Sequence, residues 1–303
     1  MNDVVPYHHV HSLLPYNPAA GGMAMAEADK LATGERILVG EHDALLVIDV
    51  MPTFMPGGGL AVPGGHEVVP VIRRVMPVFP KRRRIAKKER HPIGHIALAK
   101  SYRGIAPKTM MTFELLHRRV YEVGVTQVLA PHAKFTMQDL REYLEAVGAF
   151  MLWDDHSIAG TDEAELHPDL PESQFGYTLI TGLDPREHAY SACRGDAGTP
   201  TELMDVLRAR GVTRVFCCGL AFDYCVGWTA VFLVDEGFQV VVIEDATRSV
   251  GVPDTSVGAM LNRLSFKGIR LVQANQLCGA APSDELTTAE RRVARSRDIC
   301  GND

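Results

Sequence analysis

The sequence lacks the features of several protein classes. No window reaches the ~18 consecutive apolar residues that a membrane span needs, and the amino terminus has no basic region followed by an apolar one, as a secretory signal would. Basic residues are not in excess, because 31 Lys and Arg oppose 37 Asp and Glu for a formal net charge of -6. We therefore expect neither a nucleic acid nor a membrane as partner.

Cysteine is also sparse. The 303 residues include six cysteines and no C-x-x-C; Cys217 and Cys218 are adjacent, and the others have no framework spacing. This usage excludes a small disulfide-stapled scaffold and favours a reducing compartment, so we expect a soluble cytoplasmic protein. The one basic cluster, Lys81 to Arg84 followed by Lys87 and Lys88, is interpreted as the solvated start of a strand rather than a binding patch.

The remaining composition is that of an ordinary globular protein. Hydrophobic residues make up 46% and charged residues 22% of the chain, enough to bury a sizeable core. Residues 1–40, rich in Pro, Gly, His and Ala, are expected to form an arm, and residues 283–303 a polar tail. The segment between them, residues 41–282, is expected to fold as one domain with an inserted helical segment at about 115–150.

Short apolar runs alternate with helical patterns throughout the central segment. Such βα alternation predicts an α/β fold, a three-layer αβα domain with a mostly parallel central sheet. A capping box is expected at Thr136 and Asp139 inside the insertion, and another helix is expected to begin at Pro200, capped by Thr199. The strand-like runs lie at 44–49, 128–130, 177–180, 214–218, 239–243 and 269–272, and further helices are expected at 66–78 and 224–237.

Two residues at strand ends are candidates for chemistry. Cys225 follows the apolar run 214–218 at the start of a predicted helix, where the helix dipole and unpaired N–H groups favour a thiolate. Asp49 ends the run 44–49, at the sheet edge where ligands bind in open α/β folds. From position alone, a buried structural cysteine and a carboxylate that caps a turn remain open alternatives.

Several motifs in order resemble the nicotinamidase/pyrazinamidase branch of the isochorismatase-like hydrolases. They are strand-ending Asp49, the glycine-rich turn 56–65, the Trp-Asp-Asp-His segment 153–156, the stretches 160–170 and 182–192, and the Gly-Leu-Ala-Phe-Asp-Tyr-Cys-Val segment 219–226. The resemblance covers about residues 43–275, apart from the insertion. It implies a cysteine hydrolase that releases ammonia from an aromatic carboxamide through a thioester.

The resemblance also assigns roles by position. Cys225 corresponds to the nucleophile and Asp49 to the general base, while the N–H groups of Ala221 and Cys225 correspond to the oxyanion hole. A cis peptide bond is implied between Leu220 and Ala221. Phe54 and Trp153 match aromatics that contact the substrate ring, with ordinary core residues as the alternative.

A metal site is implied by the same resemblance. The family's ligand positions correspond to Glu89, His91 and His156, with His95 as a further candidate. A carboxylate and imidazoles suit a divalent metal, zinc first and iron or manganese as alternatives. Glu in place of the family's Asp keeps the ligand type but lengthens the side chain. A metal-free group of histidines is the alternative that the residues alone leave open.

The family pattern breaks at its third catalytic residue. The family has a lysine immediately before a glycine, and that position is Thr181 here, which brings no charge. Met51 and Phe222 also depart from the pattern around the pocket. Either another cation substitutes, or the substrate differs, or the fold has kept only a binding role; the candidate cations are Lys100, Lys108, Lys134 and Arg186.

Together these features predict an amidohydrolase of a small heteroaromatic carboxamide, nicotinamide first. The expected partner is this small-molecule amide, in a homo-oligomer. Two alternatives stay open: a non-catalytic binding or regulatory protein on the same fold, and a hydrolase of an N-carbamoyl or other acyclic amide, which needs no aromatic clamp.

Overall fold

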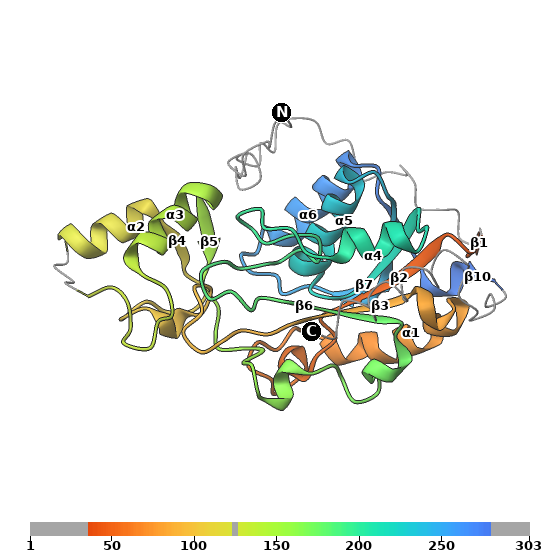
Figure 1. The fold of residues 1–303 in the computed structure, drawn as a ribbon, viewed down its shortest axis with the longest axis horizontal. Coiled ribbons are helices and arrows are strands. Elements are labelled where there is room, and N and C mark those ends of the chain that lie inside the picture. The colour runs from red at the N-terminus through yellow and green to blue at the C-terminus, as the bar shows by residue number, and fades with distance from the viewer. Residues whose placement is uncertain (1–35, 123–126, 280–303) are drawn as a thin grey trace, which may run out of the picture.

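A computed structural model describes residues 36–122 and 127–279, so most of the expected arm and all of the residues from 280 onwards lie outside the described residues. The centre is a parallel sheet of six strands in the order β6-β3-β2-β7-β8-β9 (Figure 1). This confirms the predicted αβα class. The strands are β2 (Asp43–Ile48), β3 (Arg84–Glu89), β6 (Tyr177–Thr181), β7 (Arg214–Leu220), β8 (Gln239–Arg248) and β9 (Arg270–Val272).

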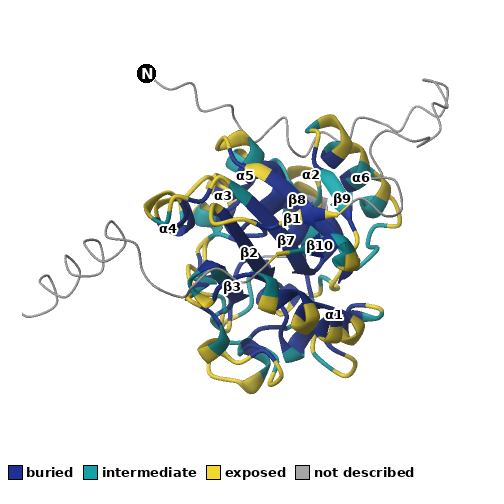
Figure 2. Ribbon diagram, turned by 90° about the vertical axis from the view of Figure 1, so that its right-hand side faces the viewer, coloured by how far each residue is buried: buried dark blue, intermediate teal, exposed yellow. Residues whose placement is uncertain are grey.

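Strand β2 lies inside the sheet and is buried along its whole length, as its apolar run requires (Figure 2). Its neighbour β3 differs, because Lys87 and Lys88 are both buried within it. The interpretation of these two lysines as part of a solvated strand start was therefore wrong. Successive side chains of a strand point to opposite faces, so Lys87 and Glu89 share one face of β3 and Lys88 lies on the other.

Helices cover both faces of the sheet. Figure 1 shows α4, α5 and α6 on one side and α1 on the other. The longer helices of this core are α1 (Val68–Val75), α4 (Leu203–Ala209), α5 (Gly227–Asp235) and α6 (Ser256–Phe266). Single turns of 3-10 helix lie at Pro52–Phe54, Gly65–Glu67, Met76–Val78, Lys81–Arg83, Ala99–Ser101, Asp162–Ala164, Glu172–Gln174 and Ala274–Gln276.

Two expected element positions were wrong. Helix α4 begins at Leu203 rather than at Pro200, because the Thr201 hydroxyl accepts a hydrogen bond from the Leu203 N–H, while the Thr199 N–H turns to the Glu187 carboxylate. Residues 128–130 form no strand, and only an isolated bridge joins Leu129 to Tyr102. An apolar run this short does not separate a strand from a buried loop.

The insertion forms a lobe beside the sheet, at the left of Figure 1. Two short antiparallel strands hold it, β4 (Met110–Thr112) and β5 (Ala149–Met151), with helices α2 (Phe113–His117) and α3 (Met137–Val147) between them and a π-helical turn at Arg118–Glu122. The predicted capping box of α3 is present: the Thr136 hydroxyl accepts from the Asp139 N–H, and Asp139 accepts from the Thr136 N–H.

The two ends of the described chain are paired. Strand β1 (Ile37–Leu38) lies parallel to β10 (Leu277–Cys278), and the Val39 N–H donates to the Cys278 carbonyl at 2.9 Å. Residues 36–39, expected within the arm, thus belong to this folded unit. Among the described residues, no helix combines the length and apolar character of a membrane span.

Candidate active site

The site lies where the central parallel strands β2 and β7 end. Asp49 follows β2 directly, with a positive φ of 49°, and Cys225 lies in a π-helical turn, Phe222–Val226, just after β7. Both side chains are buried, and one carboxylate oxygen of Asp49, one of Glu89 and the Cys225 Sγ lie within 4.8 Å of one another. The sheet edge thus brings together the two residues that the sequence singled out, as parallel strands place ligand sites.

Gly219 sets the spacing of these two strands. Its φ is 112°, and a Cβ atom on it would lie 2.0 Å from the Ile48 carbonyl oxygen. Only glycine tolerates that conformation and that close an approach. The peptide bond between Leu220 and Ala221 that follows is cis, as the resemblance implies.

A lysine that sequence reasoning missed is paired with Asp49. The Lys87 Nζ lies 2.6 Å from Asp49 Oδ2 and 3.9 Å from a Glu89 carboxylate oxygen, with Lys87 and Asp49 both fully buried. Burial raises the pKa of Asp49 to about 7, against the opposing charge of Lys87. The other oxygen, Asp49 Oδ1, is buried without a hydrogen-bond partner among the described residues, so it is available to accept a proton.

The same surroundings act on the thiol and the ammonium. Burial raises the pKa of Cys225 well above its usual value, although the charge of Lys87 acts to lower it. Burial by itself lowers the pKa of Lys87, but the charges of Asp49, Cys225 and Glu89 outweigh burial and raise that pKa. In the resting site Lys87 is therefore charged and Cys225 is a neutral thiol.

The cations proposed from the sequence lie elsewhere. Lys100 is exposed and pairs with Asp155 at 2.8 Å, and Arg186 pairs with its neighbour Asp184 at 2.8 Å. Lys108 and Lys134 are likewise exposed. The alternation of side chains along β3 could have pointed to Lys87, because a lysine two residues before Glu89 on the same strand lies on the same face of the sheet as Glu89.

Glu89 is the centre of a histidine cluster. Its Oε1 lies 3.0 Å from His156 Nε2, and its Oε2 lies 3.6 Å from His91 Nε2. Burial raises the pKa of Glu89, but His91 and His156 outweigh it and hold that pKa well below its usual value. Burial lowers the pKa of His91 to about 4, so His91 is neutral at pH 7.

Hydrogen bonds fix which ring nitrogens carry a lone pair. His91 Nδ1 lies 3.2 Å from the Gly182 carbonyl oxygen and His156 Nδ1 lies 2.7 Å from that of Asp154, so each Nδ1 carries the proton. The neutral His91 ring then turns the lone pair on its Nε2 toward the Glu89 carboxylate. For His156, burial acts to lower the pKa, but the charge of Glu89 outweighs burial and raises that pKa. His91 Nε2 is buried without a hydrogen-bond partner in the described chain. A ring-nitrogen lone pair that faces a carboxylate places two acceptors against each other, and a cation bound between them would satisfy both.

The hydrogen bonds of His95 leave it poorly suited to the metal-ligand role considered for it from the sequence, whereas His188 is well placed for that role. His95 Nδ1 accepts from the Ala97 N–H at 3.1 Å, which leaves Nε2 to donate to the Glu187 carbonyl at 3.1 Å. His95 therefore has no spare lone pair. His188, which sequence reasoning missed, bonds Asp196 through Nδ1 at 3.3 Å. Single ligand atoms of Glu89, His91 and His188 lie within 4.8 Å of one another, so this group fits a divalent metal.

Aromatic side chains line the neighbourhood of the thiol. Trp153 Nε1 donates to the Tyr190 hydroxyl at 2.8 Å, and the Tyr224 ring lies 5.0 Å from both the Trp153 and the Tyr190 rings. Phe54 lies 5.9 Å from the His156 ring. Phe54 and Trp153 are thus placed together with the site, and Tyr190 and Tyr224 extend the aromatic set.

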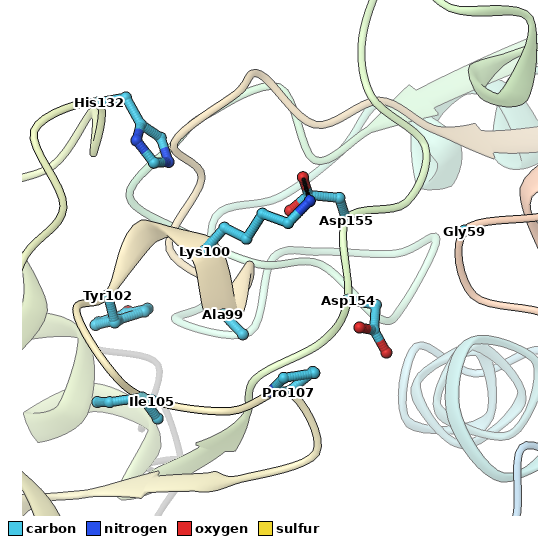
Figure 3. A pocket seen from close by; sticks show the side chains of 9 residues that line it. All are labelled: Gly59, Ala99, Lys100, Tyr102, Ile105, Pro107, His132, Asp154 and Asp155. Atoms are coloured by element: carbon cyan, nitrogen blue, oxygen red, sulfur yellow. Dashed lines mark hydrogen bonds and ion pairs between the residues drawn. The ribbon is translucent and has the colours of Figure 1, made fainter.

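A cavity of about 560 Å³ lies next to the segment that carries Trp153 and His156. Figure 3 shows the Lys100–Asp155 ion pair at this cavity, with Tyr102, Ile105 and Pro107, which precede β4, on one side. The residues that line it are Gly59, Ala99, Lys100, Tyr102, Ile105, Pro107, His132, Asp154 and Asp155. The cavity therefore lies between the glycine-rich turn of the core and the segment 99–107 that leads into the inserted lobe.

A parallel αβα sheet that gathers a cysteine, a carboxylate, a lysine and a histidine cluster at its carboxyl edge is an arrangement typical of a hydrolase. The Isochorismatase domain model matches residues 43–276, and this chain belongs to that family. A nicotinamidase of Acinetobacter baylyi is 31% identical over 210 residues, which is 68% of this chain and 81% of that enzyme.

Solved structures agree with this assignment. A nicotinamidase/pyrazinamidase from Acinetobacter baumanii is 28% identical, with a TM-score of 0.65 over 78% of this chain and 98% of that one. A pyrazinamidase of Pyrococcus horikoshii, solved in complex with zinc, is 27% identical, with a TM-score of 0.53 over 77% of this chain and 99% of that one.

Proposed function

We propose that this protein hydrolyses the carboxamide of a small heteroaromatic ring, nicotinamide or a close analogue, to the carboxylic acid and ammonia. The observation that carries the proposal is the buried cluster in which the Cys225 Sγ and an Asp49 oxygen lie within 4.8 Å, while the Lys87 Nζ lies 2.6 Å from Asp49 Oδ2. The likeness to nicotinamidases supports the choice of substrate.

In the first half of the reaction, Asp49 takes the thiol proton of Cys225 as the sulfur attacks the amide carbonyl carbon and forms a C–S bond. The N–H groups of Ala221 and Cys225 hold the resulting oxyanion. The tetrahedral species then collapses: the C–N bond breaks, Asp49 returns the proton to the leaving nitrogen, and ammonia departs from a thioester.

In the second half, Asp49 takes a proton from water as the oxygen attacks the thioester carbonyl. The C–S bond breaks, the thiol of Cys225 is restored, and the carboxylic acid product leaves. Asp49 is suited to this alternation, because a pKa of about 7 lets it accept and return a proton near neutral pH.

The aromatic side chains orient the ring. Trp153 and Tyr190 are fixed to each other by the indole-to-hydroxyl hydrogen bond, and Tyr224 packs against both. Such a wall favours a planar ring over an acyclic chain by offset or edge contacts.

A divalent metal, zinc by preference, would be held by Glu89, His91 and His156 together with His188. When bound, it would supply a positive charge that anchors a ring nitrogen or an ordered water. Asp196 would orient His188 through its Nδ1, as carboxylates do for metal-bound imidazoles. A cytoplasmic location and a homo-oligomeric state stay predictions from the sequence.

The test is ammonia release by the purified protein from nicotinamide, pyrazinamide, benzamide and an N-carbamoyl amino acid, with zinc present. We expect release from the ring carboxamides, and its loss in Cys225→Ala by at least about 1,000-fold. Cys278→Ala, which changes a cysteine in the separate two-stranded ladder of β1 and β10, serves as the matched control and should keep full activity. Preference for the N-carbamoyl substrate, unchanged by Trp153→Ala, would instead establish the acyclic alternative.

A further inference from the structure

At the position of the family's catalytic lysine this chain has Thr181, which carries no charge. Thr181 ends β6, is buried, and its hydroxyl has no hydrogen-bond partner in the part of the chain that the structure describes. The cluster beside it contains three acidic groups, Asp49, Glu89 and Cys225, whose ligand atoms lie within 4.8 Å of one another. Without a cation, the charges of the Asp49 and Glu89 carboxylates, and that of Cys225 once its proton has left, would repel one another in a region of low dielectric.

We propose that Lys87 of β3 supplies the positive charge that the family places on the neighbouring strand β6, where this chain has Thr181. The inference rests on the proposed amidase function for its reaction, but its geometry stands on its own. Lys87 Nζ lies between the two carboxylates, 2.6 Å from Asp49 and 3.9 Å from Glu89.

The register of the sheet explains how a lysine on β3 can act in place of one on β6. Glu89 pairs with Thr181 and Lys87 pairs with Leu179, so Lys87 and Thr181 lie on the same face, one strand and one pleat apart. The long flexible lysine side chain covers this offset and places its ammonium beside Asp49. The backbone on both sides is fixed, because the Asp49 N–H donates to the Lys87 carbonyl at 2.8 Å.

A purely structural role does not explain the lysine well. A buried ion pair loses most of its Coulomb attraction to desolvation, and replacing both of its partners by apolar residues of similar volume is often neutral or stabilising. The neighbouring buried lysine offers the contrast: Lys88 points to the other face, where it pairs with Glu165 and Glu172, both half-exposed and away from the thiol. Lys87 instead contacts the base itself.

In the reaction Lys87 keeps its proton throughout. Its ammonium holds Asp49 Oδ2, which leaves Oδ1 to take the proton of Cys225 and later that of water. Its charge favours the thiolate as the proton leaves the sulfur. Because the proton passes only from Cys225 to Asp49, the net charge of Cys225, Asp49 and Lys87 together is the same before and after the transfer.

The experiment compares five proteins: the unchanged protein, Lys87→Met, Thr181→Lys, the exchange variant Lys87→Thr/Thr181→Lys, and Lys88→Met as the matched control. Three properties are measured on each. They are kcat/KM for ammonia release from nicotinamide, the rate at which iodoacetamide alkylates Cys225 at one pH near neutrality, followed by peptide mass spectrometry, and the melting temperature.

We expect Lys87→Met to lower kcat/KM by about 100-fold or more and to slow alkylation of Cys225 by about tenfold, while the protein stays folded. The exchange variant should regain activity to within about tenfold of the unchanged protein, because the ammonium returns to the same cluster from the family's own strand. Lys88→Met should lower the melting temperature and leave both rates near their original values.

The inference is overturned if folded Lys87→Met keeps activity and alkylation within about threefold, or if a folded exchange variant is as slow as Lys87→Met. If Lys87→Met does not fold, the exchange variant decides alone, since a residue needed only for packing at Lys87 would not be rescued from β6. Alkylation needs no substrate. If no amide is hydrolysed by the unchanged protein, the proposed function fails, and the order of alkylation rates still tests the role of Lys87.

Discussion

Asp49 combines burial with a single cationic partner, and this balance determines when it can act as a base. Burial disfavours the charged carboxylate, whereas Lys87 at 2.6 Å favours it, and the outcome is a pKa of about 7. A carboxylate with an ordinary pKa would be a weaker base and would take the proton of the Cys225 thiol less readily. The residue is therefore adjusted to both directions of proton transfer.

The pH dependence of the reaction follows from this balance. The ionised form of Asp49 is the base, so kcat/KM for ammonia release should fall about tenfold per pH unit below pH 7 and level off above it. The profile should be measured from pH 5 to pH 8, with circular dichroism to show that the protein stays folded. A flat profile down to pH 5 would contradict the assignment of Asp49 as the base.

Metal binding should distinguish His188 from His95. His188→Ala removes a side chain whose Nε2 is available, so zinc retained after dialysis should fall clearly below that of the unchanged protein. His95→Ala removes a ring whose two nitrogens are both used by the backbone, and zinc content should change little. Zinc is measured by atomic emission. The reverse result would return His95 to the ligand set.

The sequence sufficed for the residues whose motifs are contiguous, and failed for those defined by packing. Asp49 stood out because it ends an apolar run and Cys225 because it follows one at the start of a predicted helix, and the resemblance then assigned their roles. His188 was missed because a single histidine gives no sign of which neighbour it faces, and Lys87 was missed because the alternation along β3 was not applied to a strand taken to be solvated at its start. Two adjacent lysines also resembled a solvated patch, and only the register of β3 against β2 and β6 separates their directions.

At the scale of elements, the close approach of β2 and β7 brings the base and the nucleophile together. Gly219 permits this approach, with its positive φ and the nearby Ile48 carbonyl. The register of β7 against β8 also shifts between Cys217 and Gly219, so the strand bends just before the π-helical turn that carries Cys225. Turns of this kind often mark functional sites, because they re-aim one side chain.

Gly219→Ala should be strongly destabilising, by about 3 kcal/mol or more, since the new Cβ would clash with backbone and the φ is unfavourable for alanine. Urea unfolding measures the change. Gly258→Ala in α6 is the control, because a Cβ there meets no atom within 4 Å, and it should be neutral or stabilising by up to about 1 kcal/mol. Equal effects of the two changes would refute the role given to Gly219.

Most elements could be predicted because their patterns are local. The strands predicted at 177–180 and 239–243 are present as Tyr177–Thr181 and Gln239–Arg248, and the helix capped by Thr136 follows from its capping box. The start of α4 could not be predicted, because the Thr199 N–H donates to Glu187. Glu187 lies 12 residues earlier in the sequence and comes close to Thr199 only when the chain folds. Three-dimensional competition for one N–H group leaves no mark on the local sequence.

For the molecule as a whole, the histidine cluster links strands and loops that are far apart in the chain. Glu89 ends β3, His156 follows the insertion, and His188 lies beyond β6. A cation held by these residues therefore joins the sheet to the segment that connects it with the lobe.

Zinc should raise the melting temperature because it binds the folded site and not the unfolded chain. At a free zinc concentration about 100 times the dissociation constant, the gain is about 2.7 kcal/mol. For a domain of this size that corresponds to a shift of about 5 to 10 °C. Calorimetry across a zinc series tests this, with His91→Ala as the control that should lose the dependence. A melting temperature independent of zinc would show that the cluster holds no metal.

The pairing of β1 with β10 has a mechanical consequence. The two strands are parallel, and the described chain enters through the first and leaves through the second. A force that pulls the two ends apart would therefore act along the strands and shear their hydrogen bonds together, instead of opening them one after another. Under tension, this small ladder would have to slip before any load reached the sheet that carries Asp49 and Cys225.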